Sequence, residues 1–205
     1  MLSSSVMSAL YMVSTSLLYP VVLALLGLIA LSLLYLGSFT AEYASRSRNI
    51  ERVRMGCVEA KGHIENKAFE KASETLGNCG SNDLLAGFVS DLTGFIGKPT
   101  FDIEAEKLLQ DYELRVAKEL ENPRLVARIG PMLGLMGTLI PMGPALIALS
   151  AGNIHELATN LVIAFATTVL GLLVGGVGYG IASVKKRWYS QDMSDMDYIV
   201  EMMKR

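Results

Sequence analysis

Two stretches decide the fold: RIGPMLGLMGTLIPMGPALIALS, residues 128–150, and NLVIAFATTVLGLLVGGVGYGIASVKKR, residues 160–187. Between Arg128 and Lys185 the only charged side chain is Glu156, which follows His155 in a short polar turn. A helix needs about 20 apolar residues to cross the hydrocarbon core of a bilayer. Both stretches therefore predict membrane-spanning helices, and their many small residues indicate close packing against another helix.

The remaining sequence predicts one further span and a charged region. Hydrophobic residues make up 51% of the chain and charged residues 19%, whereas a soluble domain has about 25% charged residues. We expect an all-α integral membrane protein with transmembrane helices at residues 17–37, 129–149 and 157–184. The alternatives are three core helices of a soluble protein and, for residues 17–37, a cleaved signal peptide. The latter is disfavoured because a basic leader region and a small-residue cleavage site are missing.

All Lys and Arg residues fall on one side of this topology. Thirteen lie between the first two predicted spans and five follow the third. The positive-inside rule then places that side in the cytoplasm of a cell-membrane protein. The expected topology anchors are Arg46, Arg48, Arg128, Lys185, Lys186 and Arg187. Arg46 and Arg48, with Arg52 and Arg54, either form only a solvated anchor or also contact anionic membrane lipids. The interleaved acids and bases do not indicate a nucleic-acid partner.

This orientation assigns each remaining segment. We expect residues 1–16 outside, either as a helix in the membrane interface or as a disordered end. Residues 38–128 are expected to form a cytoplasmic helical region. Residues 150–156 are then an outside loop, and 185–205 a cytoplasmic C-terminal helix.

Apolar stripes at helical spacing flank the second and third spans. They consist of Leu109, Tyr112, Val116 and Leu120 before the second span, and of Tyr189, Met193, Met196, Val200 and Met203 after the third. These stripes predict that spans two and three extend into a cytoplasmic helical stalk. Pro123 predicts a kink or short break near Asn122, and Asp83 is the expected cap of a short helix.

Cys57 and Cys79 match no metal-binding spacing. We expect structural cysteines and no cofactor.

Small and polar residues share one face of each predicted span. The expected helix-packing residues are Gly130, Gly134 and Gly137 on the second span, and Gly171, Gly175 and Gly178 on the third. Thr138, Thr167 and Thr168 lie near mid-membrane on the same faces. Polar groups at this depth often mark pathways, but a threonine hydroxyl can also bond its own helix backbone.

The predicted spans contain no Asp, Glu, Lys, Arg or His. A hydroxyl can pass a proton along but cannot hold one as a charge carrier at neutral pH. If protons cross here, the titrating group must come from another polypeptide.

The motifs LGLMGT, residues 133–138, and ATTVLGL, residues 166–172, resemble the MotA/TolQ/ExbB proton channel family. The resemblance covers about residues 125–190. It implies a homo-oligomeric ring of five copies around single helices of an ExbD/TolR-like partner that carries the proton-accepting Asp. By motif position, the pore-lining threonines of the family fall on Thr138 and Thr168, with Thr167 as a neighbour. It also implies a proton-driven energy-transducing complex and not an enzyme.

Three positions depart from the ExbB-like pattern. Pro141 stands where that pattern has Gly, Val177 where it has Pro, and Ile163 where it has Glu. The departures bear on which process the complex drives. Two other classes stay open: a non-conducting membrane scaffold whose Gly/Thr helices serve only packing, and a small-solute channel made by this chain alone.

Overall fold

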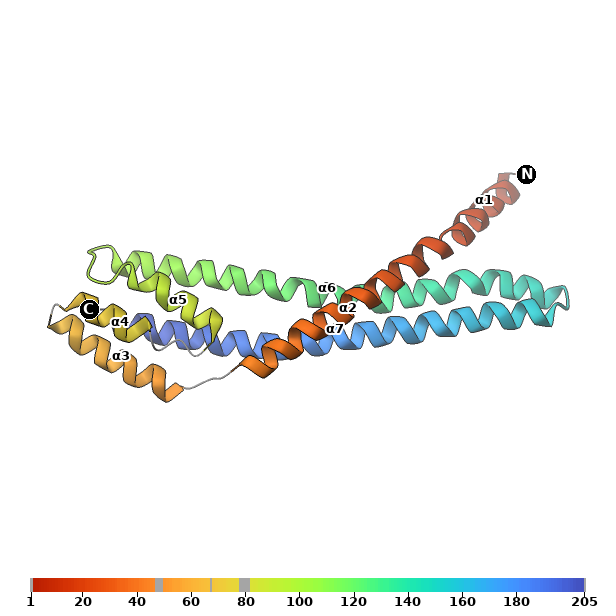
Figure 1. Cartoon of the computed structure of the whole chain (residues 1–205). Coiled ribbons are helices and arrows are strands. Elements are labelled where there is room, and N and C mark those ends of the chain that lie inside the picture. Colours follow the sequence, from red (N-terminus) through yellow and green to blue (C-terminus); the bar gives the residue numbers. More distant parts are fainter. Residues whose placement is uncertain (1, 47–49, 67, 78–81, 205) are drawn as a thin grey trace. The chain divides into compact units, whose positions relative to one another are not determined.

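The computed structural model describes residues 2–46, 50–66, 68–77 and 82–204. Within these ranges the chain forms helices joined by turns and no strand, so the all-α prediction is confirmed for them (Figure 1). In chain order the helices are α1 (Leu2–Ser16), α2 (Leu18–Ser45), α3 (Ile50–Glu65), α4 (Phe69–Gly77), α5 (Asp83–Thr93), α6 (Phe101–Ser150) and α7 (Ile154–Met203).

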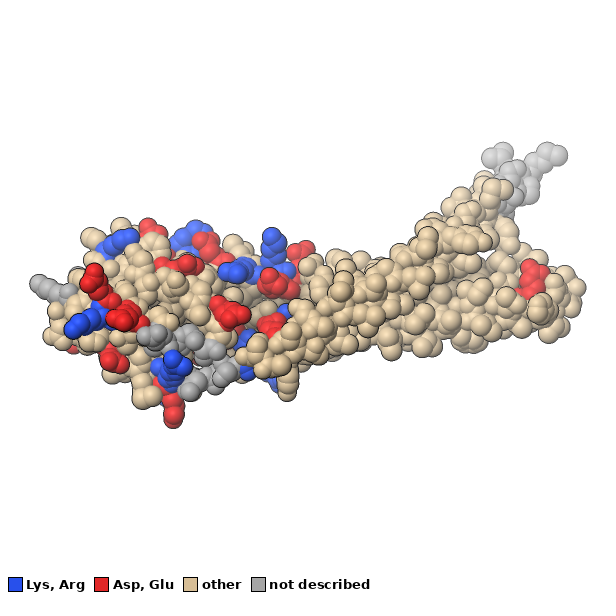
Figure 2. Space-filling model, viewed as in Figure 1, with Lys and Arg blue, Asp and Glu red and all other residues tan. Residues whose placement is uncertain are grey.

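The helices divide into two compact units. The apolar unit comprises Met1–Phe39 and Asn122–Ser183, and its only charged residues are Arg124, Arg128 and Glu156. The polar unit comprises Thr40–Glu121 and Val184–Arg205, and blue and red side chains gather over it in Figure 2.

Within the described ranges, three helical segments are long and apolar enough to cross a membrane: Tyr11–Ser45, Phe101–Ser150 and Ile154–Met203. The first of these runs from α1 into α2, and the other two are α6 and α7. The three predicted transmembrane helices therefore correspond to helices of suitable length and composition.

Of the kink or short break expected near Asn122, the break is wrong, because helix α6 continues through Pro123 without interruption. Pro131, Pro141 and Pro144 also lie inside this helix. Pro123 is buried, and its carbonyl oxygen lies close to Gly178 of α7. Neighbouring helices and local backbone adjustment allow proline inside apolar helices of this kind. The tight contact with α7 thus accounts for the continuity of α6.

The core of the polar unit packs α3, α4 and α5 against the neighbouring parts of α6 and α7. The largest wholly buried side chain is Phe88 of α5, and its ring meets that of Tyr112 edge-on at 5.3 Å between centroids. The Cys57 side chain is buried in this core, while Cys79 lies outside the described residues.

The N-cap of α5 is Asn82 and not Asp83. Asn82 has an extended backbone, and its side-chain oxygen accepts the Leu85 N–H at 2.8 Å. Asp83 already has helical geometry and begins the first turn. The cap is therefore one residue earlier than the sequence predicted, because the last extended residue before the helix supplies it.

The predicted apolar stripes of α6 and α7 meet in the polar unit. Val116 and Leu120 of α6 form a cluster with Tyr189 of α7, and Met193 packs against it. Further along, Met196, Val200 and Met203 belong to the main core. The stripes are therefore confirmed as a helix-to-helix contact.

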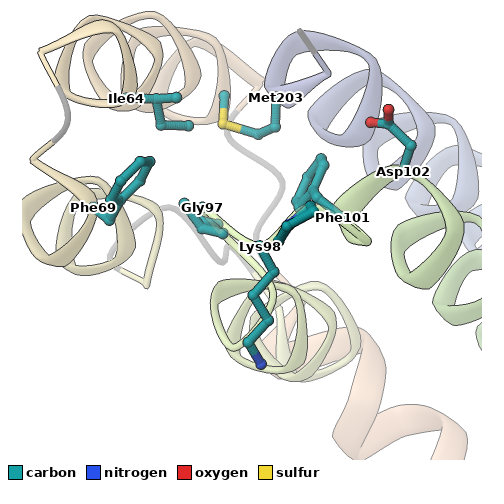
Figure 3. Close-up of a pocket in the computed structure, with 9 residues that line it drawn as sticks. Ile64, Phe69, Gly97, Lys98, Phe101, Asp102 and Met203 are labelled. Carbon is teal, nitrogen blue, oxygen red and sulfur yellow. The ribbon is translucent and has the colours of Figure 1, made fainter.

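A small cavity of about 80 Å³ lies in the polar unit (Figure 3). Gly97 lines it with a positive φ of 83°, and a methyl group there would lie 3.0 Å from the Phe69 ring. The Lys98 ammonium sits over the Phe95 ring, 5.2 Å from its centroid. Its side chain extends away from the labelled apolar side chains in Figure 3. The turn thus requires glycine, and the cavity is a packing gap beside it.

Because of Tyr112, the polar unit is expected to lose stability as the pH becomes alkaline. Burial, together with the 2.8 Å hydrogen bond that its hydroxyl donates to Asp91, raises the pKa of Tyr112 from 10.0 to about 12. The folded state therefore favours the neutral phenol. This stabilisation is complete below pH 10 and is lost as the pH rises through about 12.

We predict that Tyr112→Phe lowers the melting temperature at pH 9 and flattens the further loss of stability between pH 10 and 12. The measurement is thermal unfolding of the detergent-solubilised protein across that range. Tyr198→Phe, a more exposed tyrosine on α7, serves as the control and keeps the wild-type pH dependence. Parallel loss of stability in wild type and Tyr112→Phe would contradict the assignment.

Candidate functional site

The two long helices of the apolar unit touch through their backbones. A methyl group built at Gly171 of α7 would lie 2.7 Å from the carbonyl oxygen of Gly130 and 2.7 Å from the Cα of Gly134. One built at Gly178 would lie 2.7 Å from the Ala127 nitrogen. These separations are too short for any side chain, so glycine is required at the points of closest approach.

The contact runs antiparallel along the two helices. Gly130 meets Gly171 and Gly175, Gly134 meets Gly171 and Thr167, and Gly137 meets Thr167. Gly175 also accommodates the ring of Pro131 at 2.6 Å from its ideal Cβ position. All six glycines that the sequence singled out therefore lie along this contact between α6 and α7, and we call them the glycine seam.

Thr167 is part of this packing. It is 5% exposed, and a methyl group on Gly137 would lie 2.6 Å from both its Cβ and its Oγ1. Its hydroxyl donates to the carbonyl oxygens of Ile163 at 3.0 Å and Ala164 at 2.9 Å. Gly137, one of the expected packing residues, thus lies directly opposite a threonine.

Thr138 and Thr168 are half-buried and flank the seam on one edge. Each directly follows one member of the facing pair Gly137 and Thr167. One residue step turns about 100° in the same sense on both helices. Because the helices are antiparallel and face each other, the two steps lead to the same edge of the pair.

Both of these hydroxyls bond their own helix. Thr138 donates to the Leu135 carbonyl at 2.7 Å, and Thr168 to the Ala164 carbonyl at 3.1 Å. Exposed apolar side chains adjoin them on the same edge, including Leu135 and Leu172. The edge therefore combines two hydroxyls with an apolar surface and no charge.

A groove of about 400 Å³ lies on another side of α6. Tyr11, Ser14 and Thr15 of α1 line it together with residues 139, 140, 143 and 144 of α6. Tyr11 approaches Gly143, 3.8 Å from its ideal Cβ position. At about 100° per residue, Ile140, Gly143 and Pro144 point away from Thr138. Helix α1 thus leaves the threonine edge uncovered.

A buried ion-pair cluster lies in the polar unit. Arg46 at the end of α2 donates to both carboxylate oxygens of Asp192 of α7, at 2.7 and 2.6 Å. The Arg46 side chain is 10% exposed and that of Asp192 is 1% exposed. Asn82 donates to the same carboxylate at 2.9 Å, so the α5 cap joins the cluster.

A second pair extends this cluster. Lys185 lies 2.6 Å from Glu42, and the Tyr189 hydroxyl lies 3.4 Å from the other oxygen of that carboxylate. Burial lowers the pKa of Lys185, the hydrogen bond to Glu42 raises it, and the net effect is a raised pKa. The ammonium therefore stays charged, and the cluster joins α2, α5 and α7 with balanced charge.

Residues 98–198 match the MotA/TolQ/ExbB proton channel family. The match includes the whole of α6, the glycine seam, the three threonines, and Lys185 and Asp192 of the ion-pair cluster. This region belongs to the MotA/TolQ/ExbB proton channel family. No curated protein matches the chain.

Membership of this family confirms the resemblance seen in the two motifs. It is a family of channels, whose members form membrane complexes with partners such as ExbD/TolR. Together with the three apolar helices, it indicates a multi-pass membrane protein.

The predicted anchors take different positions in this family member. Arg46 and Lys185 lie in the ion-pair cluster, whereas Arg128, Lys186 and Arg187 are exposed. Arg48 lies outside the described residues. The sequence prediction missed Asp192, although an acid three residues after Tyr189 and four before Met196 shares the face of an apolar stripe. An acid on the apolar face of a helix indicates a buried carboxylate, and this position could have been used to predict it.

The glycine seam predicts unequal effects of alanine at adjacent positions. Gly171→Ala places a methyl group against the backbone of Gly130 and Gly134, which cannot rotate away. We expect the helices to separate and the unfolding free energy to fall by about 1–3 kcal/mol. Gly176→Ala is the matched control, because no described atom lies within 4 Å of its ideal Cβ position. Thermal unfolding in detergent measures both, and equal stability of the two variants would refute the seam.

We predict that a neutral replacement in the ion-pair cluster greatly lowers the free energy of unfolding. Asp192→Asn leaves the Arg46 charge buried without its carboxylate, which costs about 3–5 kcal/mol. Asp111→Asn is the control, because the Lys107–Asp111 pair is exposed and contributes at most about 1 kcal/mol. Replacing both partners, Arg46→Met with Asp192→Leu, is expected to cost less than Asp192→Asn alone. The measurement is again unfolding in detergent, and similar losses for Asp192→Asn and Asp111→Asn would argue against a buried pair.

Proposed function

We propose that this chain is the ring-forming subunit of an ExbB/TolQ-like complex driven by the proton motive force. Copies of the chain assemble as a homo-oligomer, with five copies as the expected number. The ring encloses the single-span helix of an ExbD/TolR-like partner. Proton flow through the pore powers transport or other work outside the cytoplasm, without enzyme activity or a cofactor in this chain.

The observation that carries the proposal is the uncovered edge with Thr138 and Thr168. The family match spans both residues, and the antiparallel contact of α6 and α7 brings both to one edge. The hydroxyls lie on a surface without charged side chains. Such an edge suits the wall of a proton path, in which hydroxyls and water pass protons along.

The predicted spans lack a carboxylate, and this indicates which chemical group the partner has to supply. None of the three predicted spans contains a side chain that can hold a proton as charge near neutral pH. Proton transport across hydrocarbon needs such a carrier, because an isolated proton is too costly to desolvate. A single-span partner that carries an Asp meets this requirement, as the family resemblance implies.

Exposed apolar surface favours insertion and assembly of the apolar unit. Phe165 and Val169 on α7 and Met132 and Leu139 on α6 are more than half exposed. Lipid tails and neighbouring copies of the chain are suitable surroundings for these side chains. The proposed orientation has α1 outside the cytoplasm. The paired ends of α6 and α7 form the stalk inside it.

The hydrogen bonds of the threonines give specific support to the second candidate, a non-conducting scaffold. All three hydroxyls bond carbonyl groups of their own helices, which a packing role would also produce. The two functions differ in whether the Thr138 and Thr168 hydroxyls are needed for proton flux.

We predict that Thr138→Val together with Thr168→Val lowers proton flux by about tenfold or more, because two hydrogen-bonding steps are lost with little change of shape. The test co-expresses the chain with its single-span partner, reconstitutes the complex in liposomes and follows a pH-sensitive dye under an imposed potential. Thr159→Val on α7 is the control, because its hydroxyl also bonds its own helix but lies outside the seam. Wild-type flux in the double variant, or the lack of a co-purifying single-span protein, would favour the scaffold.

A further inference from the structure

Tyr179 exposes a hydroxyl on the apolar unit. The residue is 70% exposed and lies within the third predicted span. Among the described residues its hydroxyl has no hydrogen-bond partner, unlike the hydroxyls of Thr138, Thr167 and Thr168. A hydroxyl that faces hydrocarbon without a partner is unfavourable. This position therefore calls for water or another polar group beside it.

The helical repeat places Tyr179 on the threonine edge. It follows Thr168 by about three turns, so that the two side chains leave α7 within about 20° of the same direction. Ser183, which is exposed, follows one turn later, and Lys186 and Arg187 come next. Helix α7 thus presents hydroxyls in a row from the seam toward its basic end.

The helix around Tyr179 leaves its side chain free to move. The positions one turn away on either side are Gly175, Gly176, Ala182 and Ser183. None of them has a large side chain, and a methyl group on Gly176 would meet no described atom within 4 Å. Exchange between the two χ1 rotamers that a helix allows, near 180° and −60°, can therefore move the hydroxyl across the helix surface without meeting a bulky neighbour on α7.

We infer that Tyr179 is a further proton-pathway residue, placed between the two threonines and the cytoplasmic end of the pore. The inference rests on the proposed function. The hydroxyl oxygen receives a proton from a water on the outer side while its own proton passes to a water on the inner side. The O–H group then turns back. The residue gains and loses one proton in each transfer and stays neutral between transfers.

A second role for a tyrosine near the end of a span is anchoring at the membrane interface. The two roles need different chemistry. Trp serves as an anchor, but its indole N–H only donates and cannot accept a proton. Phe keeps the ring and lacks any polar group. A pathway residue is therefore impaired by both replacements, whereas an anchor is preserved by Trp.

The test measures proton flux of the reconstituted complex with Tyr179→Phe and Tyr179→Trp, using the same dye assay. We expect each to lower the flux by about tenfold, with unchanged assembly in size-exclusion chromatography and an unchanged melting temperature. Tyr19→Phe is the control, because Tyr19 is an exposed tyrosine on α2. It is expected to keep wild-type flux.

Three outcomes overturn the inference: wild-type flux in Tyr179→Phe, wild-type flux in Tyr179→Trp, or an equal loss in Tyr19→Phe. The valine double variant at positions 138 and 168 separates this result from the proposed function. If that variant loses flux while Tyr179→Phe keeps it, only the role of Tyr179 fails. If neither variant loses flux, the proposed proton pathway fails as well.

Discussion

The backbone contact between α6 and α7 is the constraint on which the rest of the apolar unit depends. Within hydrocarbon, burying apolar side chains provides no net drive for helix association, so close van der Waals contact must supply it. Gly130, Gly134 and Gly171 allow this contact because a methyl group at any of them would meet backbone atoms of the other helix. The same contact explains why α6 tolerates Pro123 and Pro131, since both adjoin glycines of α7.

The contact also separates the roles of three neighbouring threonines. Thr167 points into the pair and fills the space that Gly137 leaves. Thr138 and Thr168 are each one residue further along, and that single step moves them to a common edge. A change of one position in helix register would exchange these roles. Under the proposed function, the tight seam therefore determines which hydroxyls face the pore, and a looser contact between larger residues would not.

The sequence predicted the helices and the seam because both follow from local rules. Charge-free length predicts a span, and small residues at helical spacing predict a packing face. The pairing of Gly137 with Thr167 was not predicted, since a stripe of small residues alone gives only the average direction of contact. The short break that Pro123 allowed near Asn122 is also absent, because a prediction from local proline chemistry omits the neighbouring helix that supports the backbone.

The ion-pair cluster was missed for a related reason. Arg46 and Lys185 follow the apolar segments, so the positive-inside rule accounted for both without a partner. The pairing of Arg46 with Asp192 joins residues that are distant in sequence, and only the fold brings them together.

The lack of a titratable side chain in the seam has a consequence for coupling under the proposed function. A subunit that carried its own mid-membrane carboxylate would hold a proton site whether or not the partner was present, and it could leak protons before assembly. Thr138 and Thr168 can only relay, so the wall stays insulating until a partner brings the carrier. When the carboxylate resides on the moving partner, each protonation changes the charge of the helix that must move. Proton flow and displacement are then linked by the same group, whose neutral form is favoured beside an apolar wall.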